Sequence, residues 1–328
     1  MASDDVQPLD VVPVAAVAPA AEPCAWLIDS LWTAQGAGWI ASSPKSAKTW
    51  LALDMAVSVA SGTEVARHFP VRLPGRVLFY GAEDSLPHIR ERVESIATAR
   101  GLALDELDLG LIATPALRLD TQRDLARLRK TLDRSKPRLL ILDPLVRLHR
   151  CAEDSAQEIS ALLADLRELQ RTYGIALVLV HHLRKKAASG GPDGQSLRGS
   201  GDLHAWSDDS LYLRRRDNLI VVTVEHRSAP SPPPCTLELV TDPTPHLRVV
   251  DAGGGDPAAA SQLAEQILKA LADAGRPLTR EALRDSLRTR NATLGEALVQ
   301  LRATGRIERS SAGFTLRTSN ETVPPFPP

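Results

Sequence analysis

The sequence predicts an α/β fold with a mostly parallel sheet covered by helices, followed by a small α+β module at the carboxyl end. From Trp26 to about Val250, short apolar runs alternate with helical stretches, which is the pattern of repeated βα units. After a glycine-rich break, the pattern changes to helices followed by a hairpin. The length of 328 residues also favours about two domains.

The composition supports a full-sized core without a dominant charge. Apolar residues make up 43% of the chain and the formal net charge is −1, so any nucleic-acid binding would have to come from a local patch. The three cysteines form no CxxC pair, which favours a reducing, cytoplasmic compartment and argues against a disulfide framework or a zinc ribbon. No run approaches the ~20 apolar residues of a membrane span, so no membrane partner is expected.

Residues 1–22 form a leader rich in Ala, Pro and Val that we expect to be disordered. Its apolar stretch follows three aspartates and is interrupted by Pro13 and Pro19. A secretory signal would have a basic start and an uninterrupted apolar segment. The leader is therefore not predicted to be a signal peptide.

Residues 23–250 are predicted to form the α/β domain. The expected strands are Gly38–Ala41, Val77–Tyr80, Leu109–Ala113, Leu139–Leu142, Ala176–Val180, Ser210–Leu213 and Leu219–Glu225. The expected helices are Thr49–Ser61, Pro87–Ala99, Thr121–Ser135 and Ala156–Thr172, the last closed by Gly174 as a C′ glycine. The strands over 139–142 and 176–180 are apolar on both faces, so we expect them at the centre of the sheet.

Residues 251–260, which begin with DAGGGDP, are predicted to be a flexible linker. Helices are then expected over Ser261–Ala274, Thr279–Leu287 and Asn291–Thr304, followed by a hairpin around Ser311–Gly313. Three helices and a hairpin within 261–317 are typical of a winged-helix domain. The proline-rich tail, 318–328, is predicted to be disordered.

The segment after the first core strand has the layout of a phosphate-binding loop. The strand enters a loop that ends in Lys48 and Thr49 and opens directly into a helix. In this layout backbone N–H groups bind phosphates, the lysine reaches the β and γ oxygens, and the threonine hydroxyl holds Mg²⁺. The predicted residues for ATP and Mg²⁺ are Ser43, Pro44, Lys45, Ser46, Ala47, Lys48, Thr49 and Trp50.

Two residues of this loop depart from the G-x-x-x-x-G-K-[ST] pattern. Ser42 and Ala47 occupy the two glycine positions, where the backbone takes unusual dihedrals and a ligand approaches closely. A Cβ at either position costs free energy, so a site that binds or hydrolyses ATP weakly is an open alternative. An ordinary loop with a capping Lys-Thr pair is another.

Acidic residues follow two later strands of the predicted sheet. Glu83 and Asp84 come just after the strand over 77–80, and Asp143 ends the strand over 139–142. In P-loop enzymes such an aspartate orients the Mg²⁺ shell, and a carboxylate on a neighbouring strand activates the attacking water. One such acid alone is usually a solvated strand end, but two in order after a phosphate loop favour a catalytic site.

The strand over 176–180 delivers His181 and His182 to the same edge of the sheet, where one of them could sense the γ-phosphate. A zinc pair is the alternative, which is disfavoured because adjacent strand residues point to opposite faces. A long glycine-rich loop follows. Its basic residues Arg184, Lys185 and Lys186 are predicted to contact the DNA backbone.

Taken in order, several stretches between residues 37 and 230 resemble the RepA-like hexameric helicases and related plasmid, phage and mobile-element ATPases of the RecA/DnaB-like group. The stretches are PKSAKTWLALDMAVSVASG, RVLFYGAEDSLPHIRERV, LLILDPLVRL, LVLVHHLRKK, LRGSGDLHAWSD and VEHRSAP. The resemblance implies a RecA-like P-loop NTPase core of the AAA ATPase kind. It also implies a homo-oligomeric, hexameric ring with ATP at the subunit interfaces. It also implies roles for Lys48 and Thr49 (phosphate and Mg²⁺), Glu83 (base), Asp143 (Walker B acid), His182 (sensor) and Arg198 (finger).

The sequence therefore predicts an ATP-dependent nucleic-acid motor, helicase or loader, with single-stranded DNA in the channel of the ring. A DNA-binding regulator or scaffold with a degenerate nucleotide site is the first alternative. An accessory protein that binds a replication or mobile-element partner through the winged helix is the second. In that module Arg284, Arg288 and Arg302 are the predicted nucleic-acid contacts.

Overall fold

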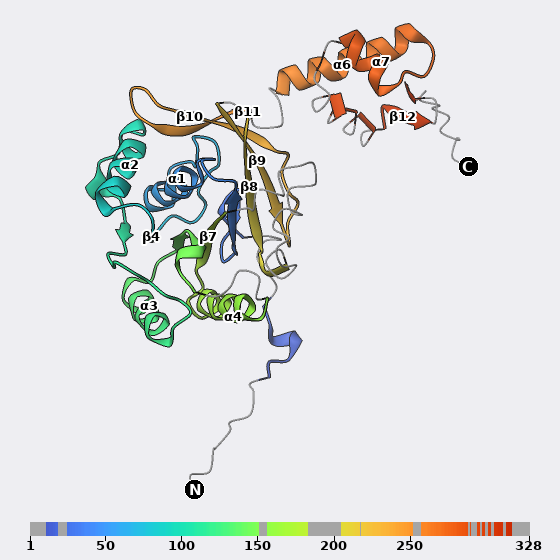
Figure 1. Ribbon diagram of the computed structural model, residues 1–328. Coiled ribbons are helices and arrows are strands. Elements are labelled where there is room, and N and C mark those ends of the chain that lie inside the picture. Colours follow the sequence, from blue (N-terminus) through green and yellow to red (C-terminus); the bar gives the residue numbers. More distant parts are fainter. Residues whose placement is uncertain are drawn as a thin grey trace. The chain divides into compact units, whose positions relative to one another are not determined.

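A computed structural model gives the structure of the chain (Figure 1). It describes residues 11–18, 25–150, 156–182, 205–216, 218–251, 257–287, 289, 294–295, 297–298, 301–302, 305–310 and 313–316. The chain separates into two compact units, residues 1–249 and 250–328. Within the leader, residues 11–18 are exposed and contain one 3-10 turn, η1 (Val14–Ala16).

The first unit is built on a nine-stranded sheet with the order β11-β10-β9-β8-β3-β7-β6-β4-β5. The strands are β3 (Ala37–Ser42), β4 (Val77–Gly81), β5 (Leu109–Leu111), β6 (Leu139–Asp143), β7 (Ala176–His182), β8 (Asp209–Arg216), β9 (Leu219–His226), β10 (Cys235–Val240) and β11 (His246–Asp251). All pairs from β8 through β3 to β5 are parallel, whereas β9 pairs antiparallel with β8 and β10. The prediction of a mostly parallel sheet is confirmed, with β6 and β7 in its interior.

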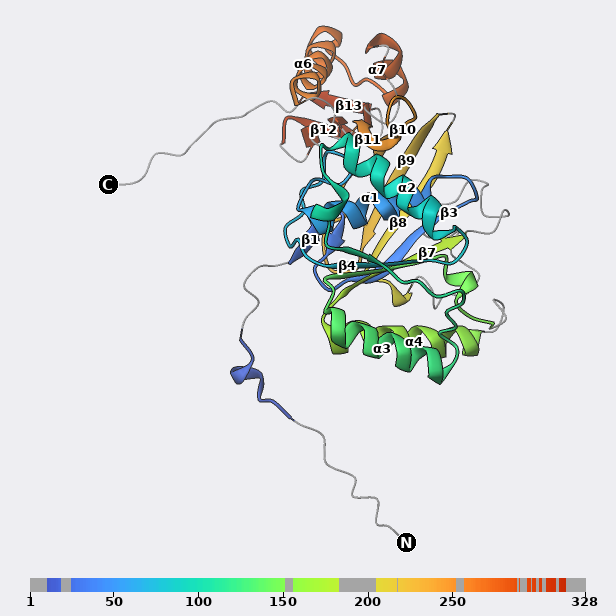
Figure 2. The ribbon, with the colours of Figure 1, turned by 90° about the vertical axis from the view of Figure 1, so that its left-hand side faces the viewer.

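Two helices cover each face of the sheet (Figure 2). On one face lie α1 (Lys48–Ser61) and α2 (Leu86–Ala99), and on the other lie α3 (Gln122–Ser135) and α4 (Ala156–Tyr173). Each face has its own apolar core, and the cores share the two sides of the same strands. The strands are buried on both faces because helices cover both, which explains their continuous apolar runs.

Local signals fix the ends of these helices. Ser85 caps α2 by accepting a hydrogen bond from the His88 amide at 3.4 Å, and Thr121 caps α3 in the same way through Asp124. The α4 helix ends before Gly174, whose φ of +58° is the left-handed C′ conformation that the sequence predicted. Single residues in the sequence therefore mark where these helices begin or end.

Four strands of the first unit were not predicted. The strands β1 (Trp26–Ile28) and β2 (Trp32–Thr33) form a small antiparallel hairpin, and β10 and β11 extend the large sheet. Strands of two or three residues are too short to show an alternation of apolar and polar positions. The β10 strand follows a run of three prolines, residues that are depleted in strands.

The second unit contains α6 (Pro257–Ala274), α7 (Arg280–Leu287) and a hairpin of β12 (Ile307–Ser310) and β13 (Gly313–Leu316). Of the third predicted helix, residues 294–295, 297–298 and 301–302 are described, and all are helical. Because α6 begins at Pro257, the predicted linker over 251–260 is wrong in its last part, which is helical. The winged-helix assignment stays a prediction. In the described part of the chain, no helix is long and apolar enough to cross a membrane.

Candidate functional site

The carboxyl ends of neighbouring parallel strands meet at one edge of the large sheet. Ser42 ends β3, Asp143 ends β6 and His182 ends β7. The strand register aligns Ser42 with His182 and Gly81 with Asp143. This edge is where α/β folds bind ligands, and the loop from β3 to α1 lies directly beyond it.

A cavity of about 310 Å³ opens at this edge, within the range of ~300–1,000 Å³ that is usual for ligand pockets. Its lining residues are Lys45, Ser46, Ala47, Lys48, Thr49, Trp50, Glu83, Arg92, Asp143, His182, Arg215 and Leu239. The structure thus brings Glu83, Asp143 and His182 together with the loop. Ser43 and Pro44, which were also predicted to bind the nucleotide, do not line this cavity.

Lys48 is buried at the first position of α1, and its ammonium points back into the loop. Its Nζ donates hydrogen bonds to the Ser42 carbonyl at 3.3 Å, the Ser42 hydroxyl at 3.0 Å and the Ser43 carbonyl at 3.0 Å. Burial lowers the pKa of Lys48 to about 8, and the carboxylates of Asp143 and Glu83 oppose this shift. The ammonium therefore occupies the loop with neutral partners that phosphate oxygens could replace.

The loop needs an unusual backbone at only one of the two positions where glycine is absent. Ala47 has a φ of +61° in the left-handed region, and Lys45 has a φ of +62°. Ser42, by contrast, is the last residue of β3 and has no positive φ. For a residue with a Cβ, the left-handed conformation costs about 1–2 kcal/mol, so the expected penalty falls on Ala47 and not on Ser42.

Asp143 and Thr49 form a pair of oxygen donors beside Lys48. The Thr49 hydroxyl is hydrogen-bonded to the Asp143 carboxylate, which is only 6% exposed. Burial raises the pKa of Asp143 to about 6. The Thr49 hydrogen bond and Lys48 oppose that rise, while Asp84 and Glu83 add to it. A hydroxyl and a carboxylate are donors that suit Mg²⁺, which usually keeps water and substrate phosphates as its other ligands.

Metal ligands are otherwise sparse. Within the described ranges, no group of three or more His, Cys, Asp or Glu side chains is placed to hold a metal ion. His181 and His182 are adjacent on β7, and adjacent side chains on a strand point to opposite faces, which disfavours zinc binding by this pair. The donors fit a magnesium ion that arrives with a nucleotide better than a metal centre made by the protein alone.

The two acids after β4 face different partners. Glu83 lines the cavity, and its Oε1 accepts a hydrogen bond from Arg147 Nε at 2.8 Å. Asp84 instead pairs with Arg92 at 2.6 Å, and the Arg92 guanidinium lies 5.8 Å from the centre of the Trp50 ring. Of the two candidate acids, only Glu83 is therefore placed to act on a ligand in the cavity.

Several predicted contacts lie elsewhere in the chain. Arg184, Lys185, Lys186, Arg198 and Arg288 lie outside the described residues. In the second unit, Arg284 pairs with Asp285 at 2.9 Å and Arg302 is exposed.

Three residues of the cavity were missed by the sequence analysis: Arg92, Arg215 and Leu239. Arg92 lies on α2 and Leu239 on β10, a strand that was not predicted. Arg215 belongs to a run of three arginines at the end of β8. The alternation of side chains along a strand could have singled out Arg215, because it shares a face with Leu211 and Leu213.

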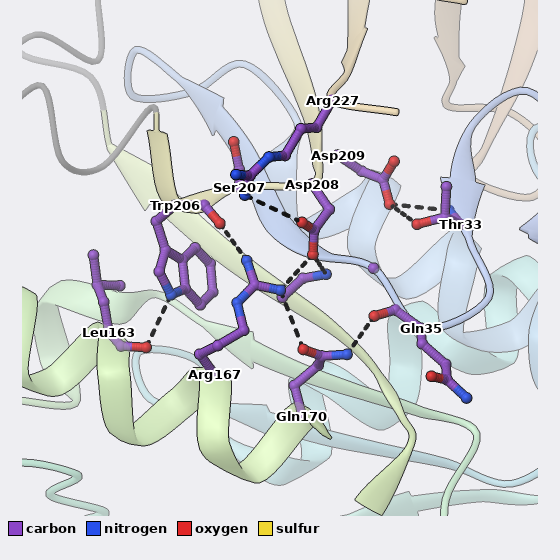
Figure 3. A network of polar contacts seen from close by, with 12 residues as sticks. Thr33, Gln35, Leu163, Arg167, Gln170, Trp206, Ser207, Asp208, Asp209 and Arg227 are labelled. Atoms are coloured by element: carbon purple, nitrogen blue, oxygen red, sulfur yellow. Dashed lines mark hydrogen bonds and ion pairs between the residues drawn. The ribbon is translucent and has the colours of Figure 1, made fainter. Parts of the chain in front are cut away.

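The amino ends of β3 and β8 carry a second cluster of charged residues (Figure 3). Arg167 of α4 reaches across to the Asp208 carboxylate and the Trp206 carbonyl. Asp208 also accepts a hydrogen bond from the Ala37 amide at 3.1 Å. Gln170 donates to the Gln35 carbonyl at 2.5 Å. These bonds fasten α4 to the starts of both strands.

Beside this cluster, Asp209 is fully buried and has three partners. It accepts hydrogen bonds from the Thr33 amide at 2.9 Å and the Thr33 hydroxyl at 2.6 Å, and it lies 2.7 Å from His226 Nδ1. The other ring nitrogen of His226 lies 3.2 Å from the Ser30 carbonyl. The two ring nitrogens thus connect Asp209 to the turn between β1 and β2. Gly36 is required here, since a Cβ would lie 2.0 Å from Asp209 Oδ2.

Comparisons with known proteins find a matching family model and similar solved structures. A family model described as an AAA domain matches residues 2–188. A solved structure of a DnaB-like replicative helicase, described with its interactions with primase, is 16% identical with a TM-score of 0.50, covering 63% of this chain and 56% of that chain. A RadB recombinase is 20% identical with a TM-score of 0.45, covering 63% of this chain and 88% of that chain. No curated protein matches the chain.

The first of these likenesses shows a shared RecA-like α/β fold. The present chain spans 56% of the helicase chain that it matches, so the two proteins share a core and not their full lengths. The family match covers the loop from β3 to α1 together with Glu83, Asp143 and His182.

Proposed function

We propose that this chain, which belongs to the AAA domain family, is an ATPase that acts on nucleic acid as a homo-oligomeric ring. Its role would be that of a helicase, translocase or loader in the replication or maintenance of a plasmid, phage or mobile element. One observation carries the proposal: Lys48, Asp143 and Glu83 converge from separate parts of the chain on a single cavity.

The loop would bind the phosphates of ATP. The first N–H groups of α1 have no acceptor within the helix, and together with the helix dipole they favour an anion. Lys48 would exchange its hydrogen bonds with Ser42 and Ser43 for bonds to phosphate oxygens. Bonds between an ammonium and a charged oxygen are stronger than those to neutral carbonyls, so this exchange is favourable.

Thr49 and Asp143 would hold Mg²⁺ beside the phosphates. The bound ion neutralises charge on the phosphate oxygens. The raised pKa of Asp143 reflects its burial beside Glu83 and Asp84, and a nearby cation favours its ionised form. Thr49 and Asp143 would thus act as metal ligands only when nucleotide is present.

Glu83 is the proposed general base. It would take a proton from water as the water oxygen bonds to the γ-phosphorus, and the bond from that phosphorus to the bridging oxygen would break to release ADP. Its ion pair with Arg147 keeps the carboxylate at the mouth of the cavity. His182 lines the same cavity, which suits the proposed sensor role.

The contacts with DNA are proposed on the sequence alone. Arg184, Lys185 and Lys186 would face single-stranded DNA in the channel, and Arg198 would reach the nucleotide of a neighbouring subunit. In the second unit, Arg284, Arg288 and Arg302 would contact nucleic acid if the unit is a winged helix. The role of Arg198 rests on the family resemblance, which covers residues 37–230, whereas the other contacts rest on the basic character of the two segments.

Replacing Lys48 tests the nucleotide site. We expect Lys48→Ala to abolish ATP binding measured by calorimetry with Mg²⁺, and to abolish phosphate release with or without single-stranded DNA. Lys130→Ala, on the exposed surface of α3, is the matched control and should behave like the wild type. Wild-type protein that shows no heat of ATP binding would contradict the proposal.

A DNA-binding scaffold with a degenerate nucleotide site is the second candidate. The left-handed conformation of Ala47 favours it, because glycine is the residue suited to that position. The two candidates differ in one measurement. Wild-type protein that shifts a DNA probe but releases no phosphate from ATP in the presence of DNA would support the scaffold and contradict the motor.

A further inference from the structure

We propose that Arg215 is a phosphate ligand of the nucleotide site, acting within its own subunit from the side opposite Lys48. The proposal rests on the proposed function, since it assigns a further binding residue to the same cavity. Arg215 lines that cavity, and its Nη1 donates a hydrogen bond to the Lys45 carbonyl of the loop at 3.2 Å.

The position of Arg215 follows from the sheet. In the register of β8 with β3, Leu213 lies beside Ser42, the last residue of β3. Arg215 is therefore level with the loop that follows β3. Leu213 packs in the core beneath α1, whereas Tyr212 packs in the opposite core. Because side chains alternate along a strand, Arg215 points to the face of α1, and its neighbours Arg214 and Arg216 point away.

The charges around the cavity favour a highly charged anion. Four cations line it, Lys45, Lys48, Arg92 and Arg215, against the two carboxylates of Glu83 and Asp143. Arg92 is already paired with Asp84. Lys48 and Arg215 both donate to carbonyl oxygens of the loop, Lys48 from α1 and Arg215 from β8.

A guanidinium at this place suits phosphate more than it suits a carbonyl. Its fork of N–H donors can bind two phosphate oxygens at once, and such charge-assisted pairs are about twice as strong as neutral hydrogen bonds. Arg215 also holds the carbonyl of Lys45, a residue in the left-handed conformation. A guanidinium has five N–H donors, so one side chain can hold a loop carbonyl and bind phosphate oxygens as well.

Two substitutions separate the charge of Arg215 from its contact with the loop. Arg215→Ala removes both, whereas Arg215→Gln keeps an N–H donor for the Lys45 carbonyl and removes the charge. The loss of a charge-assisted hydrogen bond should weaken binding of Mg-ATP by about tenfold to a hundredfold in both variants. Arg214→Ala and Arg216→Ala, on the other face of the same strand, should bind as the wild type does.

Inorganic tripolyphosphate is the second probe, because it has phosphates but no base or sugar. Its affinity should fall by the same factor as that of ATP in Arg215→Gln, with the melting temperature of the variant unchanged. If Arg215→Gln bound both probes as the wild type does, Arg215 would only hold the loop in place and would not be a phosphate ligand. A loss for ATP alone would place Arg215 at the base or sugar and also overturn the proposal.

Failure of the role proposed for Arg215 can be distinguished from failure of the proposed ATPase function. If wild-type protein binds neither probe, the proposed ATPase function fails. If wild-type protein binds both and Arg215→Gln binds them equally well, the function stands and the role of Arg215 fails.

Discussion

The two edges of the large sheet both contain buried charges, but they satisfy them in opposite ways. At the amino edge, the Asp209 carboxylate has two hydrogen bonds from Thr33 and an imidazole partner in His226. At the carboxyl edge, the Lys48 ammonium donates to neutral oxygens of the loop, and burial raises the pKa of Asp143 to about 6.

This difference separates structural charges from charges held for a ligand. A buried charge with a full set of partners stabilises the position of the elements around it. A buried charge whose pKa is shifted toward the neutral form is destabilised in the protein by itself. We infer that the amino edge holds the sheet to α4 and the first hairpin, whereas the carboxyl edge is completed by what it binds.

The largest effect on stability is expected at the amino edge. Asp209→Ala leaves the His226 ring and the Thr33 hydroxyl without their common partner, and each buried polar group left unsatisfied costs about 1–3 kcal/mol. Urea unfolding should show this loss in the free energy of unfolding. The neighbouring substitution Asp208→Ala is the control, because Asp208 is 29% exposed and should cost clearly less. Equal losses in the two variants would contradict a special role for the buried pair.

At the carboxyl edge, removal of the Asp143 carboxylate should instead increase the free energy of unfolding. The pKa of Asp143 is about 6 in the folded protein, against the ordinary 3.8. The folded state therefore binds more protons than the unfolded state between these values. The contribution of Asp143 to stability falls as the pH rises through this window, and it stays unfavourable above about pH 6. The ionised group costs on the order of 1–3 kcal/mol at neutral pH, since one pKa unit is about 1.4 kcal/mol.

Asp143→Asn should therefore make the protein without nucleotide more stable at pH 7.5, and should remove part of the pH dependence between pH 4 and 6. Asparagine keeps an oxygen that can accept from Thr49. The difference in unfolding free energy between wild type and variant, measured at pH 5 and at pH 7.5, isolates this residue. A variant that is less stable than the wild type at pH 7.5 would show that Asp143 is a structural charge like Asp209.

Much of the fold could be predicted because its signals are local. The apolar runs of β6 and β7 and the stripe of α4 repeat over enough residues to define a period. The short hairpin of β1 and β2 does not, and β10 is recognisable only from its pairing with β9. Strands that are stabilised mainly by packing against a partner strand leave a weak signal in their own residues.

The residues of the candidate site also differ in whether a local signal in the sequence identifies them. Lys48 and Thr49 belong to one contiguous motif, and Asp143 and His182 are at the ends of strands that the sequence predicts. Arg215 needed the register of β8 with β3, which places it beside the loop.

The smallest expected effects are at the two positions where the loop lacks glycine. Ala47→Gly removes the left-handed cost of about 1–2 kcal/mol but makes the unfolded chain more flexible by about 0.4–1 kcal/mol. The net gain in the free energy of unfolding should lie between zero and about 1.6 kcal/mol, which is the difference of these two terms. Ser42→Gly has no such gain, because Ser42 is in extended backbone and its hydroxyl accepts a hydrogen bond from Lys48.

Denaturant unfolding and calorimetry on both variants test this contrast. We expect Ala47→Gly to raise stability and to tighten ATP binding slightly, because the relaxed loop is closer to the conformation that phosphate requires. Ser42→Gly should lower stability, since it removes a partner of Lys48 and adds flexibility to the unfolded chain. The two glycine positions of the motif thus differ in their demands, and only the second needs glycine for its backbone. Equal gains in both variants would mean that the space taken by the Cβ, and not the dihedral angle, limits this loop.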